Sequence, residues 1–264
     1  MRGVIILSCV FLLIAIQLSS SSQFARSGET VPWGVERVHT NRLWDNNNDT
    51  TVDPGANAGQ DASIAVIDSG VFYYTDAGGI HLHEDIGNIV YGLGFDGHSG
   101  VVEEVAAYDD WRYDGHGTHV TGIVAALDND IGVIGNAPQV YLYVLSMRTG
   151  RLNELVAAIN WAVAYGIKTI SISWAFWDDP DLSRACENAV AYPNDTLIFA
   201  GSGNDGNTSI AYPAAYPSVV AVGATCPNDS RCEFSNYGPN LDFVAPGFDI
   251  NSTLPYDLGK YGNI

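Results

Sequence analysis

Two kinds of apolar pattern alternate along this chain. Short runs of apolar and β-branched residues, bounded by glycine, asparagine and aspartate, are typical of strands buried in a parallel sheet. By this pattern we expect strands at 63–68, 88–95, 140–145, 169–173, 196–200, 219–223 and 241–244. Helical spacing of apolar residues occurs at 118–127, 152–165 and 182–191. The alternation predicts one α/β domain with a mainly parallel sheet covered on both faces.

The amino-terminal residues follow a different pattern. A short charged start, Met1-Arg2, precedes an apolar run from Val4 to Leu18 and a serine-rich stretch at 19–22. This order is typical of a secretory signal peptide, and the run is shorter than the roughly 20 apolar residues that a spanning helix needs. We therefore expect a signal peptide at 1–25, a secreted domain at 26–264, and no membrane span after the signal is removed.

The charge balance narrows the choice of partners. The chain has 30 acidic and 11 basic residues, a net charge of −19. Such a surface repels nucleic acid and anionic lipid, and it suits calcium or basic peptides. We expect no nucleic-acid partner, and a monomer.

The cysteines bear on the cellular compartment. Cys9 lies in the expected signal, whereas Cys226 and Cys232 bracket a short polar loop. Export permits oxidation, and this spacing can close a disulfide at a turn, so we expect a bridge between these two. Cys186 has no partner left and lies in a helical pattern, which favours a buried thiol.

Asp68 is the first candidate for chemistry. It ends the expected strand 63–68 and is followed by Ser69-Gly70. A plain turn is one interpretation, because Asp, Ser and Gly all favour turns. An aspartic peptidase is another, but that chemistry needs two carboxylates sharing a proton, and no second Asp-Ser-Gly or Asp-Thr-Gly occurs.

His116 is the second candidate. It lies in Gly115-His116-Gly117-Thr118-His119, at the start of an expected helix, from which it can project toward the sheet edge where Asp68 ends its strand. A neighbouring carboxylate fixes the tautomer of an imidazole and stabilises its charged form, as a general base requires. A capped turn is the simple alternative. A metal site of His81, His83, His116 and His119 is another, but the i, i+3 spacing lacks the Glu of a zinc peptidase motif.

Asn204 is the third candidate. It lies in the segment Gly201-Ser202-Gly203-Asn204-Asp205-Gly206, directly after the expected strand 196–200. An Asn-Asp-Gly turn would explain the composition. Alternatively, the Asn204 amide could donate a hydrogen bond to an oxyanion that develops in a transition state.

These segments, in this order and spacing, resemble the subtilisin-type serine endopeptidases. The residues 65–70 resemble the aspartate motif of that family, 115–120 its histidine motif, 200–206 its oxyanion segment and 244–247 the strand end before its serine motif. The likeness extends from Val31 to Pro255. It implies a three-layer subtilisin-like fold and the hydrolysis of polypeptides.

The resemblance also implies roles for individual residues. Asp68 would orient His116, His116 would act as general base and acid, and Asn204 would stabilise the oxyanion. Residues Ser173, Trp174 and Ala175 would pair with the substrate backbone as an edge strand. Ala211 would lie near the primary specificity pocket, which the methyl group of Ala175 would narrow because the family commonly has glycine there.

Structural calcium is a further implication. The segment 127–133 matches a family loop that binds the ion through an asparagine side chain and alternate carbonyls, and oxygen ligands of this kind suit calcium. A helix-ending turn is the alternative interpretation. The implied ligands are Glu29, Asp85, Leu127, Asn129, Ile131 and Val133.

The sequence departs from the family pattern at its carboxyl end. It stops at Ile264, before a Gly-Thr-Ser-Met-Ala segment. From the sequence we expect an incomplete peptidase domain, inactive without its serine. The alternative is a pseudopeptidase that binds peptides, although such a protein would be expected to lose Asp68 and His116 as well.

Overall fold

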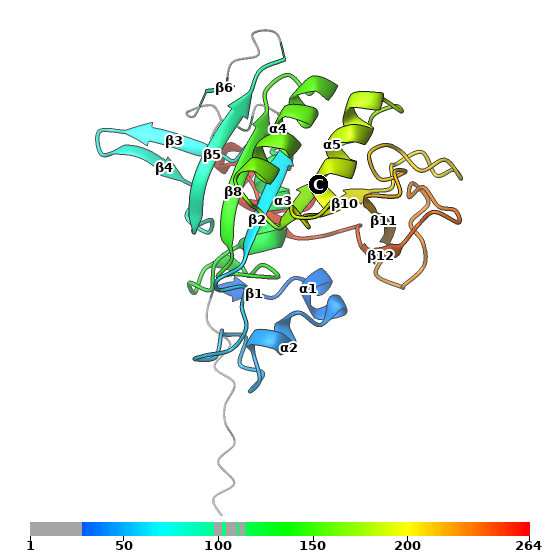
Figure 1. Ribbon diagram of the computed structural model, residues 1–264. Coiled ribbons are helices and arrows are strands. Elements are labelled where there is room, and N and C mark those ends of the chain that lie inside the picture. Colours follow the sequence, from blue (N-terminus) through cyan, green and yellow to red (C-terminus); the bar gives the residue numbers. More distant parts are fainter. Residues whose placement is uncertain (1–27, 98–101, 104–109, 111–113) are drawn as a thin grey trace, which may run out of the picture.

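The central feature of the computed structural model is a mixed sheet with a parallel core. The structure describes residues 28–97, 102–103, 110 and 114–264; the expected signal peptide lies outside them. The strand order is β12-β11-β10-β9-β2-β8-β5-β6, and every neighbouring pair is parallel except β5 and the edge strand β6 (Figure 1). The strands are β2 (Ser63–Asp68), β5 (Ile89–Phe95), β6 (Val102–Glu103), β8 (Tyr141–Met147), β9 (Thr169–Ile172), β10 (Leu197–Gly201), β11 (Val220–Thr225) and β12 (Phe243–Pro246).

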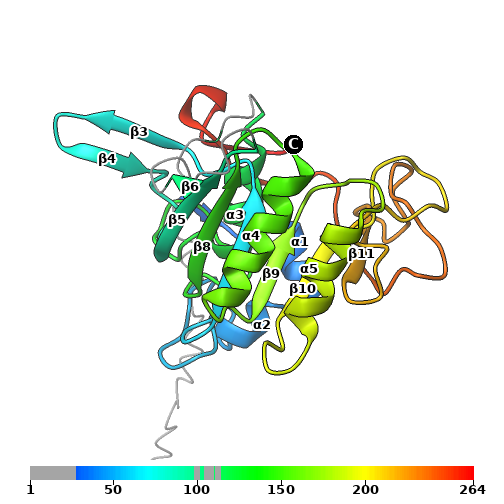
Figure 2. The same cartoon turned by 45° about the horizontal axis from the view of Figure 1, so that its top comes forward.

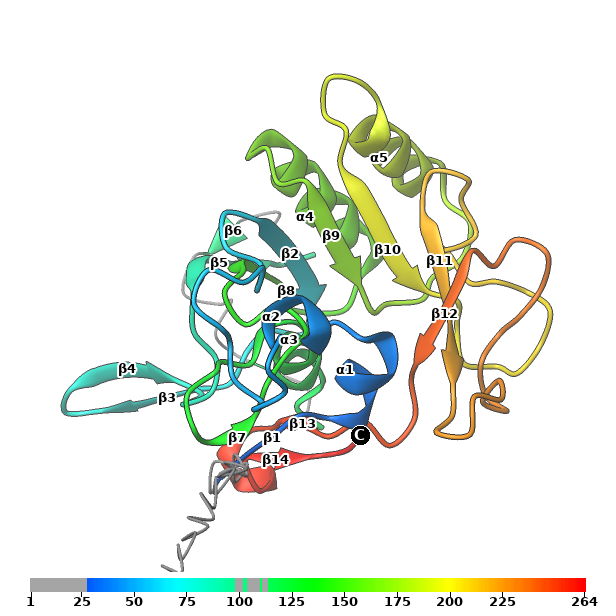
Figure 3. The ribbon, with the colours of Figure 1, turned by 90° about the horizontal axis from the view of Figure 1, so that it is seen from below.

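Helices lie on both faces of this sheet. Helices α4 (Leu152–Ala164) and α5 (Pro180–Val190) lie on one face, while α1 (Trp33–Val38), α2 (Asn41–Trp44) and α3 (His116–Ala125) lie on the other (Figure 3). The predicted three-layer α/β architecture is therefore confirmed. No helix in the described part of the chain has both the length and the apolar character to cross a bilayer.

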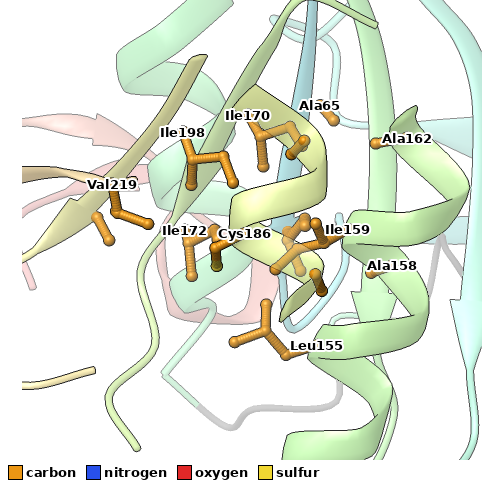
Figure 4. Packing of buried hydrophobic residues seen from close by; sticks show 14 of the residues in the cluster. Ala65, Leu155, Ala158, Ile159, Ala162, Ile170, Ile172, Cys186, Ile198 and Val219 are labelled. Atoms are coloured by element: carbon orange, nitrogen blue, oxygen red, sulfur yellow. The ribbon is translucent and has the colours of Figure 1, made fainter. Parts of the chain in front are cut away.

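The main core lies between the sheet and the pair α4 and α5. Leu155, Ile159 and Ala162 repeat along one face of α4 and meet Ile170 and Ile172 of β9, with all five side chains at most 1% exposed (Figure 4). The predicted thiol of Cys186 is buried in the same layer, where burial raises its pKa to about 12. Burying these faces removes apolar surface from water, which is the main driving force for folding.

The ends of two helices differ from the predicted ranges because capping groups extend them. Helix α5 begins at Pro180, before the expected Leu182, since the Asp179 carboxylate accepts bonds from the backbone N–H groups of Asp181 and Leu182. Helix α3 begins at His116 and is preceded by Gly115, whose φ of 68° is in the left-handed region. His116 is therefore the first helical residue.

Three two-stranded elements were not predicted. Strands β3 (Tyr73–Asp76) and β4 (Gly79–Leu82) form a hairpin that projects from the body of the protein (Figure 2). Strand β1 (Glu29–Thr30) pairs in parallel with β7 (Gly132–Val133), and β13 (Ser252–Thr253) pairs antiparallel with β14 (Tyr261–Gly262). These ladders are too short for hydrophobic periodicity to indicate them.

Candidate active site

Asp68 and His116 meet at the carboxyl edge of the sheet. Asp68 is the last residue of β2 and is 1% exposed, and its Oδ1 lies 2.7 Å from Nδ1 of His116, at the start of α3. An ionised carboxylate can only accept hydrogen bonds, so Nδ1 of His116 carries the proton and donates it. This tautomer leaves Nε2 as the basic nitrogen of the ring.

Ser69 joins the aspartate to the helix. Its backbone N–H donates to Oδ1 of Asp68 at 2.7 Å, and its Oγ accepts from the backbone N–H of Gly117 at 2.9 Å. Gly117 has no room for a side chain, because a Cβ there would collide with the carbonyl oxygen of Gly70. The glycine after His116 therefore allows the first turn of α3 to approach the end of β2.

Asp110 is a supporting residue that the sequence analysis did not single out. Its Oδ1 accepts from Oγ of Ser69 at 2.7 Å, and its Oδ2 accepts from the backbone N–H and Oγ1 of Thr118 at 2.8 and 2.5 Å. Burial raises the pKa of Asp110. A carboxylate at this position also interacts favourably with the positive end of the α3 dipole.

A cavity of about 630 Å³ opens beside His116. Asn204, which follows β10, and Ser173, which follows β9, lie in its wall, together with Asp114 and His119. Strands β9 and β10 are neighbours in the sheet, so their carboxyl ends bring Ser173 and Asn204 to the same side of the cavity. The structure thus places three of the predicted chemical groups, Asp68, His116 and Asn204, around one site.

The other residues predicted to contact the substrate, Trp174, Ala175 and Ala211, are not among those that line this cavity. Trp174 stacks on Phe176, with ring centroids 6.2 Å apart, and Phe176 forms an isolated antiparallel bridge with Tyr212. The backbone N–H of Ala211 donates to the carbonyl of Ser202 at 2.9 Å, which places Ala211 behind the Asn204 segment. Ala175 lies between Trp174 and Phe176 in the segment that leaves β9.

The predicted cation ligands gather around Asp85. Asp85 is fully buried; its Oδ2 accepts from the backbone N–H of Val133 at 3.0 Å, and its Oδ1 has no hydrogen-bond partner among the described residues. Oε1 of Glu29 accepts from the backbone N–H of Asn129 at 2.9 Å. Burial, followed by the nearby charge of Glu29, raises the pKa of Asp85 to about 7. Two carboxylates held together in this way suit a divalent cation.

The remaining predicted ligands belong to the segment 127–133 that follows α3. The backbone N–H of Leu127 donates to the carbonyl of Asp85 at 3.0 Å, and Oδ1 of Asn129 accepts from the backbone N–H of Ile131 at 3.2 Å. Within the described ranges, no three His, Cys, Asp or Glu side chains form a metal-binding group. An ion here would therefore take most of its ligands from carbonyl and amide oxygens, the donors that calcium accepts.

The histidines considered as an alternative metal set have separate partners. Nε2 of His81 lies 2.8 Å from Oδ1 of Asp76, Nε2 of His83 lies 3.0 Å from the carbonyl of Lys260, and Nε2 of His119 lies 2.9 Å from the carbonyl of Ile250. Among the described residues these rings form no metal-binding group with His116.

A disulfide joins Cys226 and Cys232. The loop that it closes is tied to α1, because the guanidinium group of Arg37 forms an ion pair with Asp229 and donates to the carbonyl of Pro227. The contacts of Arg37 therefore hold α1 against the disulfide loop that follows β11.

Comparison with known proteins agrees with this geometry. The profile of the subtilase family matches residues 59–262. Subtilisin BL of Lederbergia lenta is 36% identical over 237 residues, which cover 86% of this chain and 76% of that protein. The alkaline protease of Alkalihalobacillus alcalophilus is 35% identical over 248 residues, 90% of this chain and 56% of that protein, and subtilisin E of Bacillus subtilis is 34% identical over 244 residues, 89% and 56%. The chain thus spans about half to three quarters of these relatives, and it belongs to the subtilase family.

Proposed function

We propose that this protein is a secreted serine endopeptidase that hydrolyses polypeptides. The observation that carries the proposal is the 2.7 Å contact between Nδ1 of His116 and Oδ1 of Asp68, at the mouth of a cavity whose wall contains Asn204. A buried carboxylate that orients an imidazole is the arrangement required to activate a hydroxyl nucleophile. The names of the relatives, subtilisins and alkaline proteases, support the same reaction.

In the proposed reaction, His116 transfers a proton. Nε2 takes the proton of a serine hydroxyl as that oxygen attacks the scissile carbonyl, and then gives the proton to the leaving amine. Asp68 does not take the proton itself; its charge stabilises the imidazolium that forms. The serine would act from the cavity beside α3, and no Gly-Thr-Ser segment occurs within the 264 residues.

The substrate would lie along the carboxyl ends of β9 and β10. Ser173 to Ala175 would pair with its backbone as an added strand, since these residues follow β9 and Ser173 lies in the cavity wall. The side-chain amide of Asn204 would donate to the oxyanion. Ala211, immediately behind that segment, would limit the depth of the pocket for the side chain before the cleaved bond.

We further propose calcium as a structural ion in this protein. Glu29, Asp85, the side chain of Asn129 and the carbonyls of Leu127, Ile131 and Val133 would hold it. The buried Oδ1 of Asp85, which has no other partner in the described structure, is the observation that fits a cation. When bound, the ion would supply positive charge that offsets the repulsion between Glu29 and Asp85 and would fix the segment that follows α3.

A serine-directed phosphonate tests the proposed reaction in the full-length protein. We expect the probe to label one serine and to abolish hydrolysis of a peptide anilide. His116→Ala should lose both labelling and turnover, because the serine is then no longer deprotonated. Asp68→Asn should reduce labelling and turnover nearly as much, because the asparagine favours the wrong tautomer of the His116 ring.

The controls separate this mechanism from its rivals. Pepstatin should have no effect, and calcium should be present throughout so that a loss of structure is not mistaken for a loss of chemistry. Activity of either variant within tenfold of the wild type would contradict the assigned roles. A folded full-length protein that bound peptide but neither labelled nor turned over would be a pseudopeptidase.

A further inference from the structure

Residues near the carboxyl end of the sequence form a hairpin that contacts the first turn of α3 and the segment that follows this helix. We call residues 252–262 the bracing hairpin; it consists of β13, a 3₁₀ turn (Tyr256–Leu258) and β14. Figure 3 shows β13 and β14 lying beside β7, on the side of the sheet that carries α3. The hairpin therefore runs between the active site and the proposed cation segment.

At the start of α3 the bracing hairpin makes direct hydrogen bonds. Oγ of Ser252 donates to the carbonyl of His119, and Oγ1 of Thr253 donates to the carbonyl of Thr118, both at 2.8 Å. In return, Nε2 of His119 lies 3.1 Å from the carbonyl of Gly262. All three contacts fall in the first turn of the helix that begins with His116.

At the other end of α3, Tyr261 lies against the proposed cation segment. Its ring covers Gly132, where a Cβ would collide with the phenol, and Gly132 adopts a φ of 60°. Its other neighbour is His83, whose ring meets that of Tyr261 edge-on with centroids 5.3 Å apart. The phenol is thus held against the segment that would bind the ion.

The phenolic oxygen of Tyr261 has Asp85 as its available partner. This oxygen and Oδ1 of Asp85 are both buried and have no hydrogen-bond partner among the described residues. A phenol carries its proton at neutral pH and can therefore act as a donor. Buried polar groups are costly to leave unpaired. A carboxylate oxygen has two lone pairs, so Oδ1 of Asp85 can accept from this hydroxyl and still bind an ion.

From these contacts we propose that Tyr261 is a positioning residue of the cation site, which links binding of the ion to the bracing hairpin. This inference rests on the calcium proposal above. The Tyr261 hydroxyl donates to Asp85 and orients the carboxylate toward the ion, and the ion in turn fixes the hairpin that holds the first turn of α3. Mutating a group that hydrogen-bonds to a metal ligand and orients it typically lowers the affinity for the metal 10- to 100-fold.

The test compares Tyr261→Phe with Tyr192→Phe in the full-length protein, by thermal melting over a calcium titration from a chelated start. Phenylalanine keeps the ring over Gly132 and removes the hydroxyl, while Tyr192 is 88% exposed and lies far from the site in the chain. We expect Tyr261→Phe to need roughly tenfold more calcium for the same rise in melting temperature. Tyr192→Phe should follow the wild type.

Several outcomes would overturn the proposal. An equal drop in melting temperature with and without calcium would reduce Tyr261 to a structural role, and an unchanged calcium dependence would remove it from the site. No response of the wild type to calcium would refute the calcium proposal itself. If Tyr261→Phe does not fold, hydrogen exchange on the wild type decides: calcium should increase amide protection at 252–262, and unchanged protection would refute the link.

Discussion

Asp110 and Thr118 form a two-point contact at the start of the helix that carries His116. One carboxylate oxygen of Asp110 accepts from both the backbone N–H and the hydroxyl of Thr118, at 2.8 and 2.5 Å, while the other accepts from Ser69. Ser69 in turn donates to Asp68. The orientation of the Asp68–His116 pair therefore depends on a second carboxylate, that of Asp110, which acts through Ser69 and Thr118.

This arrangement predicts a defect in turnover for Asp110→Asn. The amide keeps the size of the side chain but offers one acceptor oxygen in place of two and no charge, so the first turn of α3 should shift. We expect kcat to fall roughly 10- to 100-fold with little change in KM, because small misplacement of reacting groups mainly affects the chemical step. Asp195→Asn, at an exposed turn, is the matched control. An effect on KM alone would argue against a positioning role.

Asn204→Ala should slow the reaction without weakening substrate binding. The alanine removes a donor to the developing oxyanion but leaves the cavity wall in place. We expect kcat to drop about 10²- to 10³-fold, a magnitude carried over from the corresponding donor in subtilisin, with KM nearly constant. Steady-state kinetics with a peptide anilide measure this, with Asn228→Ala in the exposed disulfide loop as control. Near-normal kcat would leave Asn204 as a turn residue.

The stability of the fold should fall in mild acid because of His119. Burial lowers the pKa of this ring below its usual value of 6.5, while the hydrogen bonds to the carbonyls of Ile250 and Gly262 act in the opposite direction. Below pH 6.5 the unfolded chain then binds a proton that the folded chain resists, so stability is lost as the pH falls through this range. We expect His119 to lower the melting temperature from pH 7 to pH 5, opposite in sign to Asp85, whose raised pKa favours the folded state as the pH falls.

A variant isolates the contribution of His119 to that decline. His119→Gln can still donate to the carbonyls of Ile250 and Gly262 but does not titrate. Its melting temperature should therefore depend less steeply on pH than that of the wild type. Parallel curves for the two proteins would assign the acid sensitivity to other groups.

Calcium should stabilise the protein by mass action. At a free concentration 100 times the dissociation constant, binding contributes about 2.7 kcal/mol, or roughly 5–10 °C in melting temperature for a domain of this size. Asn129→Ala should remove most of the gain. Magnesium is the control ion, because it is smaller and gives up its water reluctantly. Identical melting with calcium and with chelator would favour a simple helix-ending turn.

Loss of the disulfide should lower stability moderately and leave turnover largely intact. The loop between Cys226 and Cys232 is short, so the chain-entropy estimate for its closure is about 2 kcal/mol. The double variant Cys226→Ser/Cys232→Ser should show this loss in a denaturant titration. Reductant should destabilise the wild type and not the variant. A stability equal to that of the wild type would mean that the Arg37 contacts suffice to hold the loop.

Much of the site was readable from the sequence because its residues lie in short contiguous segments. Asp68 ends a buried apolar strand, and His116 and Asn204 stand in glycine-rich connections directly before a helix and after a strand. Hydrophobic periodicity and the residues that favour turns locate such elements in the sequence. Parallel strands then bring their carboxyl ends to the same edge of the sheet. The predicted central strands therefore recur with shifts of one or two residues, and capping by Asp179 and Gly115 accounts for the shifts at the helices.

Tertiary structure alone decided which distant groups meet. The sequence around Asp110 does not predict its contacts with Ser69 and Thr118, because this residue lies in a polar connection without hydrophobic periodicity. Likewise, Tyr261 lies against Gly132 because β13, which pairs with β14, is held to α3 by hydrogen bonds to the carbonyls of Thr118 and His119. Hydrophobic periodicity determines which face of an element is buried, whereas contacts between segments more than a hundred residues apart depend on how the packed layers fix the loops between them.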